Sequence, residues 1–561
     1  MKTSMRHLWL ALAATAMTSA AGTAHAGTVN VTGGEANGIE ASSPAQITQI
    51  TMGVAASRAA KGERLPANAA DIAAKAAADA AYERAAREGR ALVSQDAVSM
   101  AADGRSVTGT RQPSAYGSYE GKFDTGGTPP DTTGATGTKR YIQLVNSKIG
   151  IYDRSKATPL SSNTLKSLAG FTADTFDPQI IWDSTTNRFY YMMDAVVSAT
   201  DNRLAFGFSK SSAPSSTADF CKYYISYGNE FPDYPKLGDN SYFMLAGVNV
   251  YDAGGNFTRS DVIATPKPAG TSTIWTCPSF AQLTGSRAKI FQDIRDSAGD
   301  PVFSPTPANQ IDSSGYGYVV GRAWSIPAKK LLVMPVTGTS TGAPTRGTVR
   351  AVTIPDTPVP PNARQPGVSQ LLDTSDTRMT QAVLARNPSR KDGFSLWTQQ
   401  TIANGTTGSQ IQYYEMRPYP SMAPVLMRTG KIASSGSFLF NAAISPDRRV
   451  NNVDTGKNFV VGYSASSRTN SINPKIMAAS SIDGAPVTFK AIKNGYRPYW
   501  DFSCTNAGDI CRWGDYSGAA PDPAPQNGAF SAVGITNQWS PDEAMSATHA
   551  NWRSWIAQVI P

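Results

Sequence analysis

The sequence predicts an all-β fold, a seven-bladed β-propeller, preceded by a short α-helical N-terminal region. A short apolar strand, a turn and an aromatic-rich strand recur seven times, at irregular intervals of roughly 45 to 75 residues. After Gly109, Val, Ile, Thr, Tyr and Phe alternate with polar residues, and Gly, Pro, Asn and Asp interrupt the runs. Repeats of this size that contain only strands are typical of blades arranged in a ring.

Each repeat begins at a polar residue or a proline, which we take as the start of a blade. The predicted starts are Asp131, Asp177, Asp233, Pro305, Gln381, Asn441 and Asp515. The fourth and fifth are the weakest, because residues 327–377 are rich in proline, and a count of six or eight blades stays open. A ring has to close, so we expect residues 114–123 to pair with the final strand in residues 551–561.

The first 26 residues have the pattern of a secretory signal peptide. Lys2 and Arg6 form its positive region, residues 8–17 its apolar core, and Ala-His-Ala at residues 24–26 its cleavage site. The apolar core is too short to cross a bilayer, and no later segment has eighteen uninterrupted apolar residues. We therefore expect an exported protein without a transmembrane segment, in the periplasm or outside the cell.

Residues 27–109 form a flexible leader followed by an Ala-rich helical segment in this interpretation, and residues 110–561 form the propeller. Residues 27–50 are rich in Gly, Ser and Thr. From Asn68 onward, Ala, Lys, Arg and Glu predict a helix that Asn68 caps and Gly89 weakens near its end. The helix has little apolar surface. Three roles of this helix stay open: it packs on the outside of the ring, it is a pro-segment, or it is a loose spacer.

The cysteine content agrees with export. The chain has four cysteines, which in an oxidising compartment suggest two disulfides with three alternative pairings. We favour Cys221–Cys277 and Cys504–Cys511, of which the second closes a short loop. A zinc site fits poorly, because the C-x2-C spacing is missing and histidine is nearly absent.

Charge and motifs exclude several function classes. The formal net charge of +9 is spread along the chain without a dense Lys/Arg run, which disfavours nucleic-acid binding. HExxH, P-loop and Rossmann motifs are absent. His549 is the only histidine after the expected signal peptide, so we expect no Ser-His-Asp triad on the central face.

Four of the predicted starts carry a carboxylate: Asp131, Asp177, Asp233 and Asp515. Around one face of a ring these groups would repel one another, so they need backbone amides, basic side chains or a cation as partners. Lys236 and Arg512 lie in the same motifs, and Ca²⁺ is the cofactor candidate. The alternative is purely structural, with each Asp accepting hydrogen bonds from nearby loop amides.

Tyr234 and Tyr516, next to two of these starts, are candidates for stacking on sugar rings. For Trp182 and Trp513 we expect packing between the sheets. Glu415 and Arg417 alternate onto one face of a strand, where an ordinary ion pair is the leading interpretation and a ligand contact the other.

Several motifs together resemble a group of secreted bacterial β-propeller proteins that are related in general style to sialidase-like propellers. The resemblance covers residues 125–561 and rests on PPDTTGATGTKRYIQLVNSKIGIYD, FPDYPKLG, YYEMR, NFVVGYSASS and RWGDYSGAAPDP. It implies the fold and secretion, without an activity. The Asp-box of true sialidases is distorted in SSIDGAPVTF, residues 480–489, and their arginine triad cannot be assigned.

Two functions follow as expectations. The first is a secreted protein whose central face binds a glycan or a cell-surface polymer, which the missing histidines and enzyme motifs favour. The second is a glycosidase or polysaccharide lyase that uses Asp, Glu and Tyr with Arg or Lys. A pair of carboxylates about 5 to 10 Å apart in an open pocket would favour the enzyme.

Overall fold

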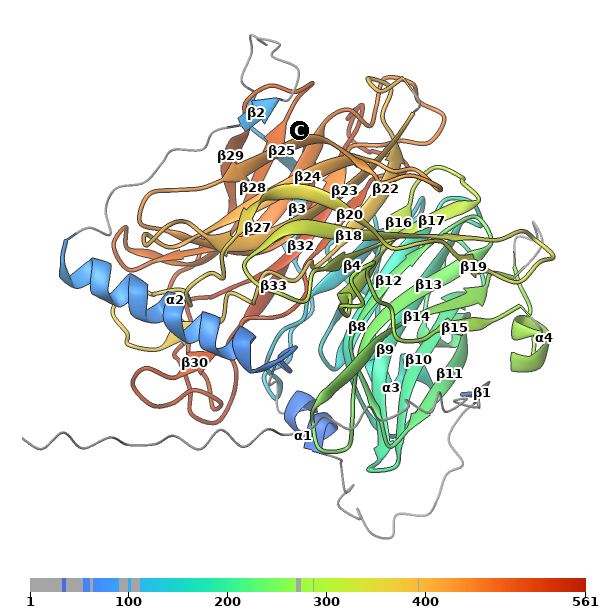
Figure 1. The fold of residues 1–561 in the computed structure, drawn as a ribbon, viewed down its shortest axis with the longest axis horizontal. Coiled ribbons are helices and arrows are strands. Elements are labelled where there is room, and N and C mark those ends of the chain that lie inside the picture. Colours follow the sequence, from blue (N-terminus) through green and yellow to red (C-terminus); the bar gives the residue numbers. More distant parts are fainter. Residues whose placement is uncertain are drawn as a thin grey trace, which may run out of the picture. The chain divides into compact units, whose positions relative to one another are not determined.

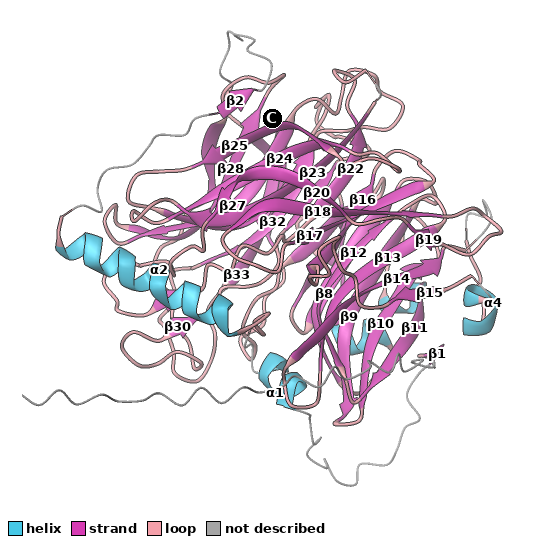
Figure 2. Cartoon of the chain, in the orientation of Figure 1, coloured by secondary structure: helices cyan, strands magenta, loops and turns pink. Residues whose placement is uncertain are grey.

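Antiparallel β-strands are the main secondary structure of the computed structural model, and its sheets have a propeller arrangement (Figures 1 and 2). The structure describes residues 33–36, 54–60, 64–89, 99–101, 111–268, 274–285, 287–391 and 393–561. The chain divides into two units, residues 1–31 and 32–561, and all described residues belong to the second. The predicted signal peptide lies outside the described residues.

The strands follow one another as antiparallel neighbours in successive groups. The first groups are β4 (Thr133–Thr136), β5 (Arg140–Val145), β6 (Lys148–Asp153) and β7 (Pro159–Thr164); β8 (Asp174–Asp183), β9 (Arg188–Ser198), β10 (Asp201–Ser209) and β11 (Phe220–Gly228); and β12 (Phe231–Asp239), β13 (Phe243–Tyr251), β14 (Phe257–Pro266) and β15 (Lys289–Phe291).

The later groups repeat this pattern. They are β16 (Phe303–Gln310), β17 (Tyr316–Arg322), β18 (Ala328–Thr337) and β20 (Arg350–Thr357), with β19 (Thr345–Arg346) beside β18; β22 (Ala382–Arg386), β23 (Phe394–Ala403), β24 (Ser409–Arg417) and β25 (Val425–Ile432); and β26 (Phe438–Pro446), β27 (Phe459–Ser467), β28 (Ile472–Ser481) and β29 (Thr488–Lys493). A separate parallel pair joins β21 (Leu371–Leu372) to β30 (Ile510–Cys511).

The ring closes as the sequence predicted. The last group combines β31 (Gly518–Pro521), β32 (Val533–Trp539) and β33 (Arg553–Ile560) with the early strand β3 (Ser114–Glu120). Ser114 lies opposite Ile560, and Glu120 lies opposite Trp555. The first and last parts of the propeller therefore share one sheet, which pairs an otherwise free strand edge.

The leading strands of the groups lie side by side in chain order. Strand β4 lies against β8, β8 against β12, β12 against β16, β16 against β22, β22 against β26, β26 against β31, and β31 again against β4. Every predicted start falls on one of these strands or within three residues before it. The predicted starts therefore meet on one face of the ring, which we call the start face.

Apolar side chains fill the space between neighbouring groups. Leu204 and Phe206 of β10, for example, belong to the same buried cluster as Val248 of β13 and Ile263 of β14. Trp182 and Trp513 are buried, as predicted. The alternation of apolar and polar residues thus gives each sheet a face that packs on the next group.

The predicted helix is present as α2 (Ala69–Arg87). The side chain of Asn68 accepts hydrogen bonds from the amides of Ala70 and Asp71, at 2.9 and 3.1 Å. Shorter helices are α1 (Val54–Ala60), α3 (Leu165–Ala169) and α4 (Phe280–Thr284). Among the described residues, no helix has the length and apolarity that crossing a membrane requires.

Helix α2 is packed on the propeller, which excludes a loose spacer. Its Tyr82 ring lies 5.1 Å from that of Phe438, and Asp71 is buried in an ion pair with Arg322 at 2.6 Å. Within the expected flexible leader, β1 (Gly33–Glu35) pairs with β11, and after α2 the short strand β2 (Ser99–Ala101) pairs with β25. These short strands satisfy backbone groups on sheet edges.

The two disulfides have the favoured pairing, Cys221–Cys277 and Cys504–Cys511. They close loops with sequence separations of 56 and 7 residues. Loop-closure entropy gives about 4 kcal/mol of stabilisation for the longer loop and about 2 kcal/mol for the shorter one.

Reduction of both disulfides should therefore lower the melting temperature. The variant Cys221→Ala/Cys277→Ala should lose more stability than Cys504→Ala/Cys511→Ala, because its loop is longer. Differential scanning calorimetry, with thiol titration to verify reduction, measures both effects. An unchanged melting temperature after complete reduction would contradict the stabilising role.

Candidate functional site

The leading strands share an unusual backbone conformation near the start face. Asp177, Tyr234, Ser304 and Asn441 have φ values of 54°, 57°, 51° and 47°, each at an irregularity in the pairing of its strand. Left-handed backbone is unfavourable by roughly 1–2 kcal/mol for residues other than glycine. Such bulges re-aim side chains, and strained residues of this kind cluster at functional sites.

Asp131 is held by polar groups from two different parts of the ring. Its carboxylate accepts hydrogen bonds from the amide of Asp515 at 2.6 Å and from the side chain of Asn146 at 2.5 Å. Asp131 is fully buried. At Asp131 the contacts therefore agree with the structural alternative, in which the Asp accepts hydrogen bonds from amide groups.

Asp515 is paired with two arginines. Arg512 donates to one carboxylate oxygen at 2.5 Å, and Arg64, from outside the propeller, donates through its Nε to the other at 2.9 Å. Burial opposes ionisation, but Arg512 and Arg64 together lower the pKa of Asp515 below its ordinary value. Arg512 thus has the partner role that its place in the motif suggested.

Tyr516, Tyr234 and Lys236 form a buried group beside these carboxylates. The Tyr516 hydroxyl donates to Asp177 at 2.6 Å, and the rings of Tyr516 and Tyr234 stack with centroids 5.3 Å apart. Lys236 Nζ lies 3.6 and 3.8 Å from the centroids of these rings. Burial lowers the pKa of Lys236 well below its ordinary value.

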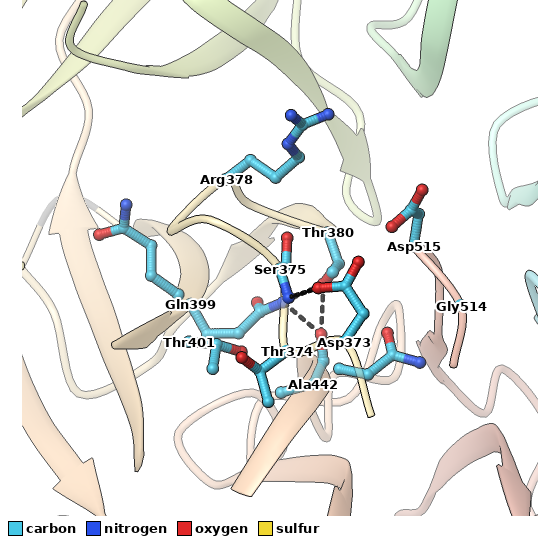
Figure 3. Close-up of a pocket in the computed structure, with 12 residues that line it drawn as sticks. Asp373, Thr374, Ser375, Arg378, Thr380, Gln399, Thr401, Ala442, Gly514 and Asp515 are labelled. Carbon is cyan, nitrogen blue, oxygen red and sulfur yellow. Dashed lines mark hydrogen bonds between the residues drawn. The ribbon is translucent and has the colours of Figure 1, made fainter. Parts of the chain in front are cut away.

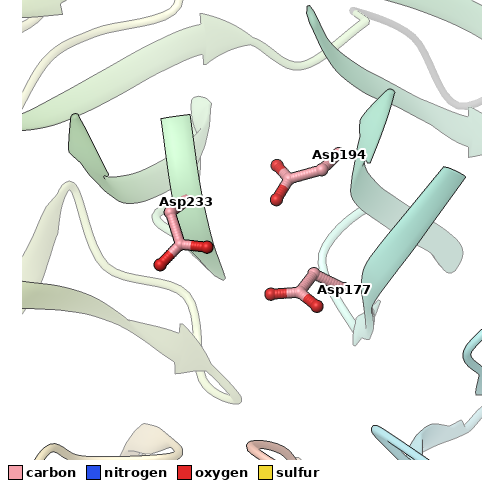
Figure 4. Close-up of side chains that lie close together, drawn as sticks. All are labelled: Asp177, Asp194 and Asp233. Atoms are coloured by element: carbon pink, nitrogen blue, oxygen red, sulfur yellow. The ribbon is translucent and has the colours of Figure 1, made fainter. Parts of the chain in front are cut away.

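Three carboxyl groups gather between β8, β9 and β12. Oxygens of Asp177, Asp194 and Asp233 all lie within 4.8 Å of one another, and Figure 4 shows the three groups turned toward a common space. Burial, followed by the repulsion of neighbouring carboxylates, raises the pKa of Asp177 and Asp233 to about 7. The pKa of Asp194 is raised well above its ordinary value for the same reasons. We call these three residues the acidic cluster.

An N-terminal segment, residues 64–87, covers part of the start face, and we call it the strap. Arg64 reaches Asp515 and also donates to Asp373 at 2.7 Å. Lys75 Nζ donates to the Thr374 hydroxyl at 2.6 Å and to two backbone carbonyls. Asp373 and Asp515 both line a small cavity next to Arg378, shown in Figure 3. The strap therefore covers the part of the start face around Asp373, Thr374 and Asp515.

A larger pocket remains open beside α2, with a volume of about 560 Å³. Apolar side chains of Pro66, Ile72, Leu371 and Ile510 form part of its wall. The polar wall comes from both sides of the pocket and consists of Arg64, Asp71, Lys75, Asp79, Asn362, Asp373, Ser375 and Asp376. Burial lowers the pKa of Lys75 to about 8.

Most of the predicted site residues come together, and two do not. Asp131, Asp177, Asp233, Tyr234, Lys236, Arg512, Asp515 and Tyr516 lie on the start face. Glu415 instead binds Arg390 at 2.7 Å and Arg428 at 3.1 Å, within the group of strands β22–β25. Arg417, on the same strand, donates to the Tyr419 hydroxyl.

Tyr234 and Tyr516, the candidates for stacking on sugar rings, are buried in this conformation. Only 2% of Tyr234 and none of Tyr516 is exposed to solvent. Their rings pack on each other and on Lys236, where β12, which carries Tyr234, meets the residues just before β31, which include Tyr516.

Sequence reasoning missed Asp194, Arg64, Asp373, Asp376 and Arg378. Asp194 carried a usable signal, since it is the single charge inside the apolar stretch of β9, YYMMDAVV. Arg378 is buried and binds Asp376 through two hydrogen bonds of 2.7 Å. Asp373 and Asp376 lie in the Pro-rich residues 327–377, and Arg378 follows directly. This segment has no periodicity from which their positions could be predicted.

Comparisons with known proteins give no family. No protein-family model matches the chain, and no curated protein matches it. The similar solved structures include a mutant of the Synechocystis apocarotenoid oxygenase, with 10% identity, a TM-score of 0.37 and coverage of 65% of this chain and 72% of that one.

Two further structures are similar at the same level. A subtype N11 neuraminidase-like protein of A/flat-faced bat/Peru/033/2010 has 11% identity, a TM-score of 0.31 and coverage of 67% and 92%. Drosophila Semaphorin 1b, extracellular domains 1-2, has 8% identity, a TM-score of 0.35 and coverage of 80% and 87%. With TM-scores this low, we draw no functional conclusion from these similarities.

Substitution of Arg64 tests whether the strap is held by the start face. Arg64→Ala removes the strap's ion pairs to Asp373 and Asp515, which then keep only Arg512, and should weaken the docking of residues 64–87 by about 3 kcal/mol. Limited trypsin digestion should then cleave the strap faster at Lys75, as followed by mass spectrometry. The control Arg87→Ala removes an equal charge from the exposed end of α2. Equal cleavage of both variants at Lys75 would contradict this role for Arg64.

Proposed function

We propose that the protein is an exported β-propeller that binds a glycan or a cell-surface polymer on its start face. Export is supported by the signal-peptide pattern of residues 1–26 and by the two disulfides, and places the protein in the periplasm or outside the cell. The ligand would enter the open pocket beside α2.

The observation that carries this proposal is the pocket of about 560 Å³, which lies in the size range of small-ligand sites. A saccharide presents apolar C–H faces together with hydroxyl groups that both donate and accept hydrogen bonds. The pocket offers apolar contact through Ile72, Leu371 and Ile510 and polar groups of both charges around them. This combination suits a sugar unit better than a purely apolar or purely ionic ligand.

We also propose a count of seven blades and a distant relationship to sialidase-like propellers. The count is supported by the contacts that lead from β4 through the other leading strands and back to β4. The relationship is supported by the motifs of residues 125–561. Residues 480–489, the distorted Asp-box, connect β28 to β29 through a turn at Asp483 and Gly484.

A second candidate function is a carbohydrate-active enzyme, a glycosidase or a polysaccharide lyase. It is favoured by one contact, the hydrogen bond of 2.6 Å from the Tyr516 hydroxyl to Asp177. A tyrosine activated by a carboxylate resembles the nucleophile of sialidases. Because the strap covers this region, the enzyme would need the strap to move before a substrate reaches Tyr516.

The binding proposal is tested by a glycan array followed by calorimetry on the best ligand. Ile510 lines the pocket and is 47% exposed, so Ile510→Glu should fold normally and weaken binding at least about ten-fold. Val453→Glu makes the same change at an exposed position in the loop between β26 and β27 and should leave the affinity unchanged. Equal affinities of the two variants would place the ligand elsewhere.

The enzyme candidate is tested by mass spectrometry of the same glycans after incubation. Both the native protein and Arg64→Ala, in which the strap is loosened, should be used. If the candidate is correct, Arg64→Ala releases product faster than the native protein. Adding Tyr516→Phe should then reduce the rate at least about 100-fold while the fold is retained, since the phenyl ring preserves the packing. Glycans recovered intact from every variant would eliminate the enzyme.

A further inference from the structure

We propose that the acidic cluster, Asp177, Asp194 and Asp233, binds one Ca²⁺ ion at the junction of the β8–β11 and β12–β15 groups. This inference goes beyond the binding of a glycan, because it concerns a metal site beneath the strap and needs no glycan for its test.

The spacing of the carboxylates fits one ion. Calcium is bound by oxygen ligands at 2.3–2.6 Å, so two ligands on opposite sides of the ion lie about 4.6–5.2 Å apart. Oxygens of all three residues lie within 4.8 Å of one another. A single ion can therefore contact all three side chains while the backbone stays in place.

Asp194 gives an independent indication that a ligand belongs here. Its side chain is fully buried, and neither carboxylate oxygen has a hydrogen-bond partner in the described structure. Its carboxyl group points toward the other two in Figure 4. A buried carboxylate without a partner is strongly unfavourable, and a cation in the shared space supplies what is missing.

The neighbouring lysine does not fill this role. Lys236 is 1% exposed and lies against the rings of Tyr234 and Tyr516, and its Nζ has no hydrogen-bond acceptor among the described residues. Its ammonium group therefore makes no hydrogen bond to the acidic cluster. The other bases of the start face are engaged with Asp515, Asp373 and Asp376.

The ligand chemistry and the spacing favour calcium among common metals. All three ligands are carboxylates, which select hard cations over zinc or copper. Magnesium demands near-octahedral geometry at 2.0–2.1 Å and loses its water reluctantly, so a site built from protein carboxylates alone suits calcium better.

Calorimetry of the chelator-treated full chain with CaCl₂ tests the proposal. We expect one site, a melting temperature that rises with CaCl₂, and at least ten-fold weaker binding in Asp194→Asn. The control Asp454→Asn changes an exposed carboxylate in the loop between β26 and β27 and should bind as the native protein does. MgCl₂ in place of CaCl₂ should bind more weakly.

A second readout covers the case in which Asp194→Asn does not fold. Tb³⁺ bound in the acidic cluster should emit when tyrosine is excited, because the Tyr516 hydroxyl is bonded to Asp177. Ca²⁺ should displace this emission from the native protein. The absence of Ca²⁺ binding at millimolar concentration, full binding by folded Asp194→Asn, or tighter binding of Mg²⁺ would each overturn the proposal.

Discussion

The convergence of the leading strands on one face is the constraint on which the rest of this structure depends. The ring places β4, β8, β12 and β31 around one axis, and in this chain each of them carries a carboxylate at or just before the strand: Asp131, Asp177, Asp233 and Asp515. At each position a different partner offsets the repulsion between these carboxylates. Asp131 has an amide and an asparagine, Asp515 has two arginines, and Asp177 has a tyrosine hydroxyl. The proposed calcium ion would complete this set at Asp194 and Asp233.

The strap follows from the same constraint. Because Arg64 forms ion pairs with Asp373 and Asp515, a segment that precedes the propeller in the chain becomes part of its start face. Its other ion pairs, Asp71 with Arg322 and both Asp79 and Glu83 with Arg364, extend this contact to β17 and to the segment between β20 and β21. The strap covers the region near the axis, so the accessible part of this face is the pocket beside α2. The tyrosines next to the leading strands consequently pack inside the protein.

The sequence was sufficient for the β-propeller arrangement and only partly for the site. Period-two alternation and regular turns predict the strands, and β3 was recognised as the closing strand because a ring needs one. The Asp residues at the starts could be found since they recur at equivalent places. Alternation places Glu415 on a face of its strand but does not give its neighbours, which proved to be Arg390 and Arg428. Arg64 acts only through distant contacts, which no local pattern encodes.

Hydrogen–deuterium exchange with and without the best-binding glycan tests most directly the central claim, that the start face beside the strap is the functional face. The account predicts slow exchange of residues 64–87 in the free protein. With the glycan, it predicts further slowing in these residues and in the segments around Asn362–Asp376 and Gly508–Ile510, which line the pocket. Protection confined to outer strands such as β7 and β29, or a strap that exchanges as fast as an unfolded peptide, would contradict the account.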